Sequence, residues 1–93
     1  MGARQLAWAW SAQTSGSAEL KITLLALAEL ACDEGFVEVS LGRLSAMTAI
    51  LVEDLDDVLS SLANTQHVES YSVCGSYDNP NSLVTIQINE GRQ

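Results

Sequence analysis

Two short apolar patterns that follow one another closely in the middle of the chain constrain the fold most. The first predicts a helix over Leu41–Met47 that buries Leu41 and Leu44, with Ser40 as its N-cap. The second predicts a helix over Leu51–Ala63, whose buried side consists of Leu51, Val52, Leu55, Val58, Leu59 and Leu62. Only a short turn separates the two patterns, so we expect two helices that are neighbours in space.

A longer helix is predicted before this pair, over Ala18–Cys32. Ser17 is its expected N-cap, and Gly35 fits the stop signal just past its end. The apolar positions follow helical spacing and form one buried face, made of Leu20, Leu24, Leu27 and Ala31. Upstream, Leu6–Ala12 alternates small and large apolar residues, which would place both tryptophans on one side of an extended segment, as core or dimer contacts.

Three further segments have the character of strands. Phe36–Ser40 predicts a short strand or an extended link, and His67–Cys74 and Leu83–Asn89 predict a β-hairpin across a loop rich in turn formers. Alternation gives the last strand an apolar face made of Val84, Ile86 and Ile88. Helix, strand, helix, turn, helix and hairpin is the winged helix-turn-helix order. The sequence therefore predicts one α+β domain over residues 1–93, mainly α, with three helices and a C-terminal wing.

The composition excludes several classes of protein. With 93 residues and 47% apolar content, the chain can bury a core rather than stay disordered. No apolar run reaches the length of a membrane span, and no signal peptide is visible, so we expect a cytoplasmic protein. Cys32 and Cys74 are expected to be buried free thiols. One histidine and no nucleophile, phosphate-loop or metal-ligand motif predict no enzyme, no cofactor and no metal site.

Charge is distributed very unevenly along the chain. There are 12 acidic and 4 basic residues, which gives a net charge of −8. No lysine or arginine lies between Arg43 and Arg92, whereas that span holds the acids Glu53, Asp54, Asp56, Asp57, Glu69, Asp78 and Glu90. We therefore expect a strongly negative field over this half of the protein, which repels phosphates and attracts basic partners.

The sequence also resembles a known family. LAWAW followed by LKITLLALAELACDEG and then by SLGRLSAMTAILVEDLDDVLSSLANTQHV is similar to the winged-helix domains of phage and plasmid replication initiators and related regulators. The similarity covers about Leu6–Glu69. The residues identical to the family pattern are Ser40, Leu41, Arg43, Leu44, Thr48, Leu59 and Leu62. Those alike in character are Ile50, Leu55 and Val68. Because these are mostly expected core positions, the resemblance implies the fold more strongly than it implies a function.

The departures from the family lie where its members read DNA. In such domains the third helix enters the major groove with polar and basic side chains. This chain has Ala49 where the family has its turn glycine, and Leu51 where the family has the serine that caps the third helix. The positions that would face the groove hold Val52, Glu53, Asp54, Asp56 and Asp57. Carboxylates at these positions repel phosphates, so DNA binding by this helix is not expected.

These observations favour a non-enzymatic, acidic winged-helix protein with a charge-inverted third helix. Its expected partner is the basic, nucleic-acid-binding surface of another protein, which it would occupy as a DNA mimic. A phage-encoded inhibitor that acts in the cytoplasm of a bacterial host, such as an anti-CRISPR protein, fits this hypothesis. The predicted partner-binding residues are Glu53, Asp54, Asp56, Asp57, Tyr77 and Asp78.

Three other interpretations stay open at the level of sequence. The acids could form a solvated face that keeps a small protein in solution. The chain could be a DNA-binding regulator or replication-initiation factor that uses another surface, with Arg4, Lys21 and Arg43. It could also be an assembly module that forms homodimers or larger oligomers through its tryptophans or an exposed strand edge.

Overall fold

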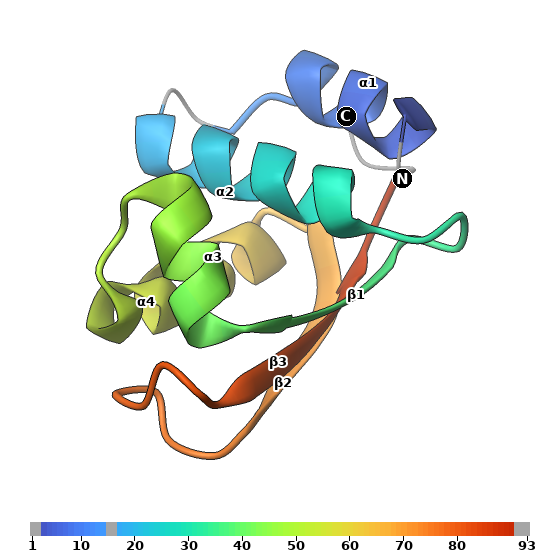
Figure 1. Ribbon diagram of the computed structural model, residues 1–93. Coiled ribbons are helices and arrows are strands. Elements are labelled where there is room, and N and C mark those ends of the chain that lie inside the picture. Colours follow the sequence, from blue (N-terminus) through green and yellow to red (C-terminus); the bar gives the residue numbers. More distant parts are fainter. Residues whose placement is uncertain (1–2, 15–16, 91–93) are drawn as a thin grey trace.

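The computed structural model describes residues 3–14 and 17–90, in which helices cover one face of a small sheet (Figure 1). The rest of the predicted 1–93 domain, Arg92 included, lies outside the described residues. The elements in chain order are α1 Ala3–Ser11, α2 Ala18–Leu30, β1 Phe36–Ser40, α3 Leu41–Thr48, the 3₁₀ helix η1 Val52–Asp54, α4 Leu55–Asn64, β2 Val68–Cys74 and β3 Leu83–Ile88. The predicted α+β class is confirmed, and the described residues hold four α-helices where three were expected.

The three strands form one antiparallel sheet in the order β1-β3-β2. In the central strand, Ile86 lies opposite Val37 of β1 on one side and Tyr71 of β2 on the other. The inward face that alternation predicts for β3 is buried, namely Val84, Ile86 and Ile88. The segment Phe36–Ser40, predicted as a strand or an extended link, is therefore a strand. It adds a third strand to the predicted hairpin.

Three helices supply the centre of the core. The fully buried leucines are Leu24, Leu27, Leu41, Leu44, Leu55, Leu59 and Leu62, all on faces that the sequence predicts to be buried. Leu51 is also predicted to be buried, but it is 61% exposed. The helix predicted from Leu51 is in fact η1 followed by α4, and Leu51 precedes both with an extended backbone (φ −60°, ψ 143°). Its side chain therefore lies outside the apolar face of α4.

The prediction that Leu6–Ala12 is extended is wrong, because most of this segment belongs to α1. The inner side of this helix is formed by Gln5 and Ala9, and Ala12, which directly follows the helix, is buried with them. Trp8 is half-buried against the core, whereas Trp10 is 65% exposed. Small inward residues let α1 lie close to α2, on the side of α2 away from the sheet (Figure 1).

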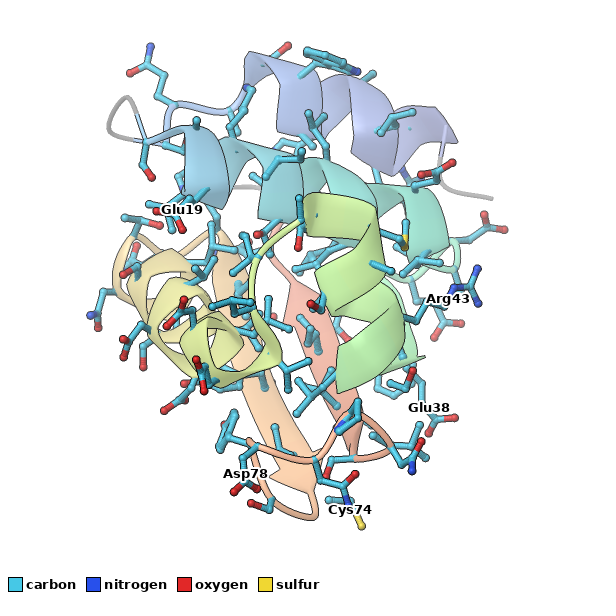
Figure 2. The ribbon with its side chains drawn as sticks, turned by 60° about the vertical axis from the view of Figure 1, so that its left-hand side comes forward. Glu19, Glu38, Arg43, Cys74 and Asp78 are labelled. Carbon is cyan, nitrogen blue, oxygen red and sulfur yellow. The ribbon has the colours of Figure 1, made fainter. Side chains whose placement is uncertain are left out.

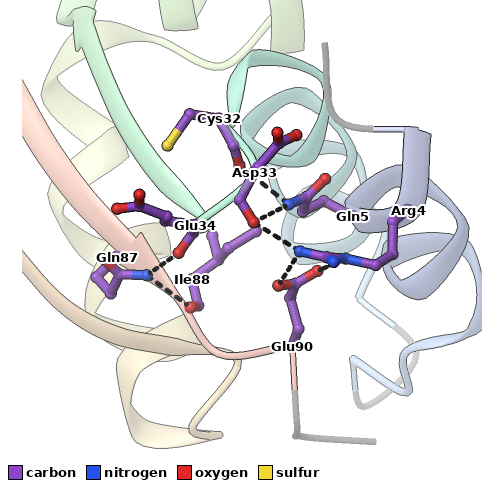
Figure 3. Close-up of polar contacts among 8 residues, drawn as sticks. All are labelled: Arg4, Gln5, Cys32, Asp33, Glu34, Gln87, Ile88 and Glu90. Atoms are coloured by element: carbon purple, nitrogen blue, oxygen red, sulfur yellow. Dashed lines mark hydrogen bonds and ion pairs between the residues drawn. The ribbon is translucent and has the colours of Figure 1, made fainter.

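Polar contacts fasten the start of α1 to the turn that follows α2 (Figure 3). Gln5 Nε2 donates to the carbonyl oxygens of Cys32 (3.0 Å) and Asp33 (3.1 Å). Arg4 Nη2 donates to the same Asp33 oxygen (2.6 Å), and Arg4 Nε pairs with Glu90 Oε1 at 3.1 Å. Because Gln5 is buried and the Arg4 side chain is mostly exposed, we expect the Gln5 hydrogen bonds to stabilise this docking more than the ion pair does.

Lys21 caps the other end of α1. Its Nζ donates to the carbonyl oxygens of Ala9, Trp10 and Ala12 at 2.5 to 2.8 Å. Carbonyls at the end of a helix have no partner within the helix, and the helix dipole favours a cation there. Lys21 therefore ties α2 to α1, and its charge is already used within the protein.

Both predicted N-caps are confirmed. Ser17 Oγ accepts from the N–H of Leu20 at 3.3 Å, and Ser40 Oγ accepts from the N–H of Arg43 at 3.2 Å. The end of α2 comes two residues earlier than predicted, at Leu30. Most other element boundaries agree with the prediction to within one residue.

The early end of α2 changes the setting of one thiol. Cys32 lies in the turn after the helix, where Gly35, with φ +79°, donates its N–H to the Cys32 carbonyl at 2.9 Å. Gly35 therefore closes this turn and does not end the helix. Cys32 and Cys74 are free thiols as predicted, but both are exposed, so the expectation that they are buried is wrong.

Candidate protein-binding surface

The carboxylates predicted to form a binding surface lie on two consecutive short elements. Glu53 and Asp54 belong to η1, and Asp56 and Asp57 to the first turn of α4. Acids are favoured at the start of a helix, where free N–H groups and the helix dipole give a positive potential. Glu53, Asp54 and Asp57 are exposed, whereas Asp56 is half-buried. Three of the four carboxylates therefore face solvent.

The turn before η1 fixes the angle at which these acids are presented. Ala49 has φ +60°, the left-handed conformation, at the position where the resembling family has glycine. Thr48 Oγ1 donates to the carbonyl of Leu44 (2.8 Å) and accepts from the N–H of Ile50 (3.3 Å). The hydroxyl of Ser45 donates to the carbonyl of Ile50. Side-chain hydrogen bonds to the backbone therefore hold the turn, and η1 starts from a fixed geometry.

Asp54 and Asp57 line a groove together with a third carboxylate that the sequence analysis missed. The groove has a volume of about 550 Å³, and Glu19 from the first turn of α2 contributes to its lining. Leu20 and Val58 supply an apolar part of the same lining. No local pattern marks Glu19, because only the packing of α2 beside α4 brings it to the other two acids. A groove with carboxylates and apolar side chains matches the amphipathic side chain of lysine or arginine.

Asp56 is half-buried and contacts the hairpin. Tyr71 Oη donates to Asp56 Oδ1 at 3.5 Å and lies 3.0 Å from Ser60 Oγ. Tyr77 belongs to the same cluster: partial burial, and then the Asp56 carboxylate and Tyr71, raise its pKa from 10.0 to about 12. Asp56 and Tyr77 are both predicted partner-binding residues. The structure brings them together, but they interact with each other within the protein. Tyr77 is half-buried, so only part of this predicted partner-binding side chain is open to solvent.

The raised pKa of Tyr77 has a measurable consequence. A folded-state pKa above the unfolded value means that the native protein holds this proton more tightly, so stability is lost as pH rises from about 10 to about 12. In a Tyr71→Phe variant, which leaves Tyr77 as the single tyrosine, ultraviolet difference absorbance should show ionisation above pH 10. Adding Asp56→Asn should lower that midpoint. A midpoint at the ordinary value of 10.0 with Asp56 intact would contradict the cluster.

Asp78 lies in the loop between β2 and β3. Its carboxylate accepts a hydrogen bond from the Ser76 hydroxyl, and it is exposed. In Figure 2, Glu19 lies above α4 and Asp78 below it, while Arg43 and Glu38 lie on the other side of the molecule. We use the name acidic face for the exposed carboxylates of η1, α4 and their surroundings, namely Glu19, Glu53, Asp54, Asp57 and Asp78.

The basic side chains of the described residues do not neutralise the acidic face. The salt bridge found among these residues joins Arg4 to Glu90. Lys21 is bonded to carbonyl oxygens at the end of α1 and just after it, and no salt bridge or hydrogen bond joins the Arg43 side chain to another described side chain. The acidic face therefore keeps its charge, and its field acts on whatever approaches it.

Two further observations concern the same described ranges. None of the helices has both the length and the apolar character needed to cross a membrane. No three side chains of histidine, cysteine, aspartate or glutamate come together in a way that could hold a metal ion.

Comparison with protein-family models, with curated proteins and with solved structures gave no match to this chain.

Proposed function

We propose that this chain is an acidic winged-helix protein that binds the basic, nucleic-acid-binding surface of another protein and excludes nucleic acid from it. The observation that carries the proposal is the acidic face itself. Its carboxylates project from η1, from the first turns of α2 and α4 and from the β2–β3 loop, and no described lysine or arginine pairs with them. Unpaired surface charge of one sign steers a partner of the opposite sign and raises its association rate.

The order of elements supports the winged-helix part of the proposal. From α2 onward the chain runs helix, strand, helix, turn, helix and hairpin, as the resemblance implies. Ala49 adopts a left-handed conformation at the family's glycine position, and Ser40 caps α3. In the winged-helix reading, η1 and the first turn of α4 stand where relatives present their DNA-reading side chains.

The acidic groove supports the choice of a basic protein as partner. An arginine or lysine from the partner would lay its apolar stem along Leu20 and Val58 and bring its cation to Asp54 and Asp57. Charge-assisted hydrogen bonds of this kind are stronger than neutral ones. DNA as a ligand of this face is disfavoured, because phosphate contacts provide most nonspecific affinity and here they would meet carboxylates.

The biological form that we propose is an inhibitor that acts in the cytoplasm of a bacterial host on a nucleic-acid-processing protein. A phage-encoded anti-CRISPR protein is one such inhibitor. This form rests on the resemblance to phage and plasmid replication proteins together with the charge of the acidic face.

Neutralising the groove tests the proposal. The variant Asp54→Asn with Asp57→Asn keeps the side-chain shapes and removes two charges from the groove. The partner is first captured from a host lysate with the wild-type chain as bait. At low salt it should associate with this variant about 3- to 10-fold more slowly than with the wild type. The difference should shrink as salt rises, because screening removes the long-range attraction. Surface plasmon resonance with the captured partner measures both effects.

The matched control is Glu38→Gln with Glu69→Gln, which removes two exposed charges outside the acidic face. This control should bind almost as the wild type does. Equal losses in both double variants would show that only net charge matters and would reject the groove. In a gel-shift titration at about 50 mM salt, tight binding of duplex DNA by the wild-type chain would instead favour a DNA-binding function.

A further inference from the structure

The loop between β2 and β3, residues 75–82, is held to the start of α3 by its backbone. The N–H group of Leu41 donates to the carbonyl oxygen of Ser82 at 2.9 Å. The next N–H group, of Gly42, donates to the carbonyl oxygen of Pro80 at 2.9 Å. The first N–H groups of a helix have no acceptor within the helix, so an outside group must supply one. The loop therefore caps α3 with two of its own carbonyls.

The contact between this loop and α3 explains a glycine. A Cβ added to Gly42 would lie 3.0 Å from both the Cβ and the carbonyl oxygen of Pro80. Non-bonded carbon atoms normally stay about 3.5–4.0 Å apart, so the loop would have to move. Gly42 belongs to α3 and has no positive φ, so its backbone conformation suits alanine as well. The close approach of Pro80 is therefore the reason for a glycine here.

The loop is also bonded within itself. The Ser82 hydroxyl donates to the carbonyl oxygen of Ser76 at 2.7 Å, and Ser82 is 4% exposed. The N–H of Ser82 donates to the carbonyl oxygen of Asn79 at 3.0 Å. The side-chain oxygen of Asn79 accepts from the N–H of Asn81 at 2.9 Å. Because these bonds make the loop compact, a push at Pro80 would move the whole loop.

A second contact holds the same loop to the start of α4. Tyr77 is half-buried, packs against the core and interacts with Asp56 in the first turn of α4. In Figure 1 the loop lies below α3 and α4, in agreement with both contacts. Asp78 directly follows Tyr77, so the loop must stay docked for Asp78 to lie with the other carboxylates of the acidic face.

We propose that the β2–β3 loop is a strap that opens and closes as one unit over the starts of α3 and α4. When it opens, α3 loses two of its caps, Tyr77 leaves Asp56, and Asp78 moves away from the rest of the acidic face. Closure of the strap therefore regulates how many carboxylates a partner meets at once. This consequence rests on the proposed function, whereas the opening itself can be measured on the chain alone.

Amide hydrogen exchange of the chain without a partner tests the proposal. The amides of Leu41 and Gly42 exchange when the strap opens, so their protection factors should agree to within about 3-fold. Gly42→Ala should lower the protection factors at both positions by about 10-fold or more, the equivalent of one to two hydrogen bonds. Helix propensity alone predicts the opposite, because alanine in place of glycine would raise them by about 2- to 5-fold. The sign of the change therefore separates the two causes.

A change at the other contact tests whether the strap moves as one unit. Tyr77→Phe keeps the ring but cannot donate to Asp56. It should lower the protection factors of the two amides at the start of α3 by about 3- to 10-fold. Ser72→Ala is the matched control, because it removes a hydroxyl that is hydrogen-bonded to the Thr85 hydroxyl at 2.9 Å, in the same hairpin but outside the strap. It should leave these amides unchanged.

Three outcomes overturn the proposal. Exchange at the start of α3 that is slower or unchanged in Gly42→Ala would show that the loop yields without opening. Exchange that is unchanged in Tyr77→Phe would show that the two contacts open separately, and an equal effect of Ser72→Ala would show a general loss of stability. Circular dichroism confirms that the variants are folded. A partner that binds away from the acidic face would refute the proposed function but leave these exchange results as expected.

Discussion

Replacing Leu59 by alanine is expected to lower the free energy of unfolding by about 2–5 kcal/mol. Leu59 lies in α4 with no exposed surface, within the core formed by three helices and the sheet. The truncated side chain loses its apolar burial and leaves a cavity that the close-packed surroundings cannot fill. A domain of this size has a total stability of only about 5–15 kcal/mol, so the variant should unfold at a much lower urea concentration.

The matched control for this change is Leu51→Ala. It deletes the same atoms from a leucine that is 61% exposed, so we expect a change below about 0.5 kcal/mol. Urea unfolding followed by circular dichroism measures both variants. Similar losses of unfolding free energy in the two variants would mean that Leu51 is buried in solution and that α4 begins before Leu55.

Replacing Lys21 by methionine is expected to lower the free energy of unfolding by about 1.5–3 kcal/mol, the range for hydrogen bonds that involve a charged group. Methionine keeps most of the apolar stem but cannot donate to the carbonyls of Ala9, Trp10 and Ala12. The end of α1 then loses its cation and its attachment to α2. Amide hydrogen exchange in α1 should accelerate more than exchange in α4, because the loss is local.

Arg43→Met is the control for Lys21→Met, since it removes an equal charge from an exposed side chain that has no bond to another described side chain. At concentrations where the chain is monomeric, it should change stability by less than about 0.5 kcal/mol. If Lys21→Met left exchange in α1 unchanged, the carbonyl contacts would not be what holds this helix.

The parts of the fold that the sequence predicts are those determined by local signals. Leucines at helical spacing and serine caps mark α2 and α3, and strict alternation marks β3. The helix α1 lacks these signals, because it buries Gln5 and Ala9 and leaves Trp10 in solvent. A search for large apolar residues on one face therefore points to the wrong side of this segment.

The same distinction applies to the candidate site. The acids of η1 and α4 are visible in the sequence, and three of them are exposed as predicted. Glu19 joins them only because α2 packs beside α4, which no neighbouring residue indicates. The contact between Asp56 and the hairpin likewise depends on how the loop folds back toward α4. Contacts between distant segments therefore decide which of the predicted residues are exposed to solvent.

The ion pair between Arg4 and Glu90 has a consequence for how the molecule can be handled. These residues are 86 positions apart, yet their side chains are 3.1 Å apart. The start of α1 and the end of β3 therefore lie close together. A short peptide could join them and make the chain circular. Figure 1 places this closure at the end of the molecule away from the β2–β3 loop. A tether attached there would immobilise the protein and leave the acidic face turned toward solution.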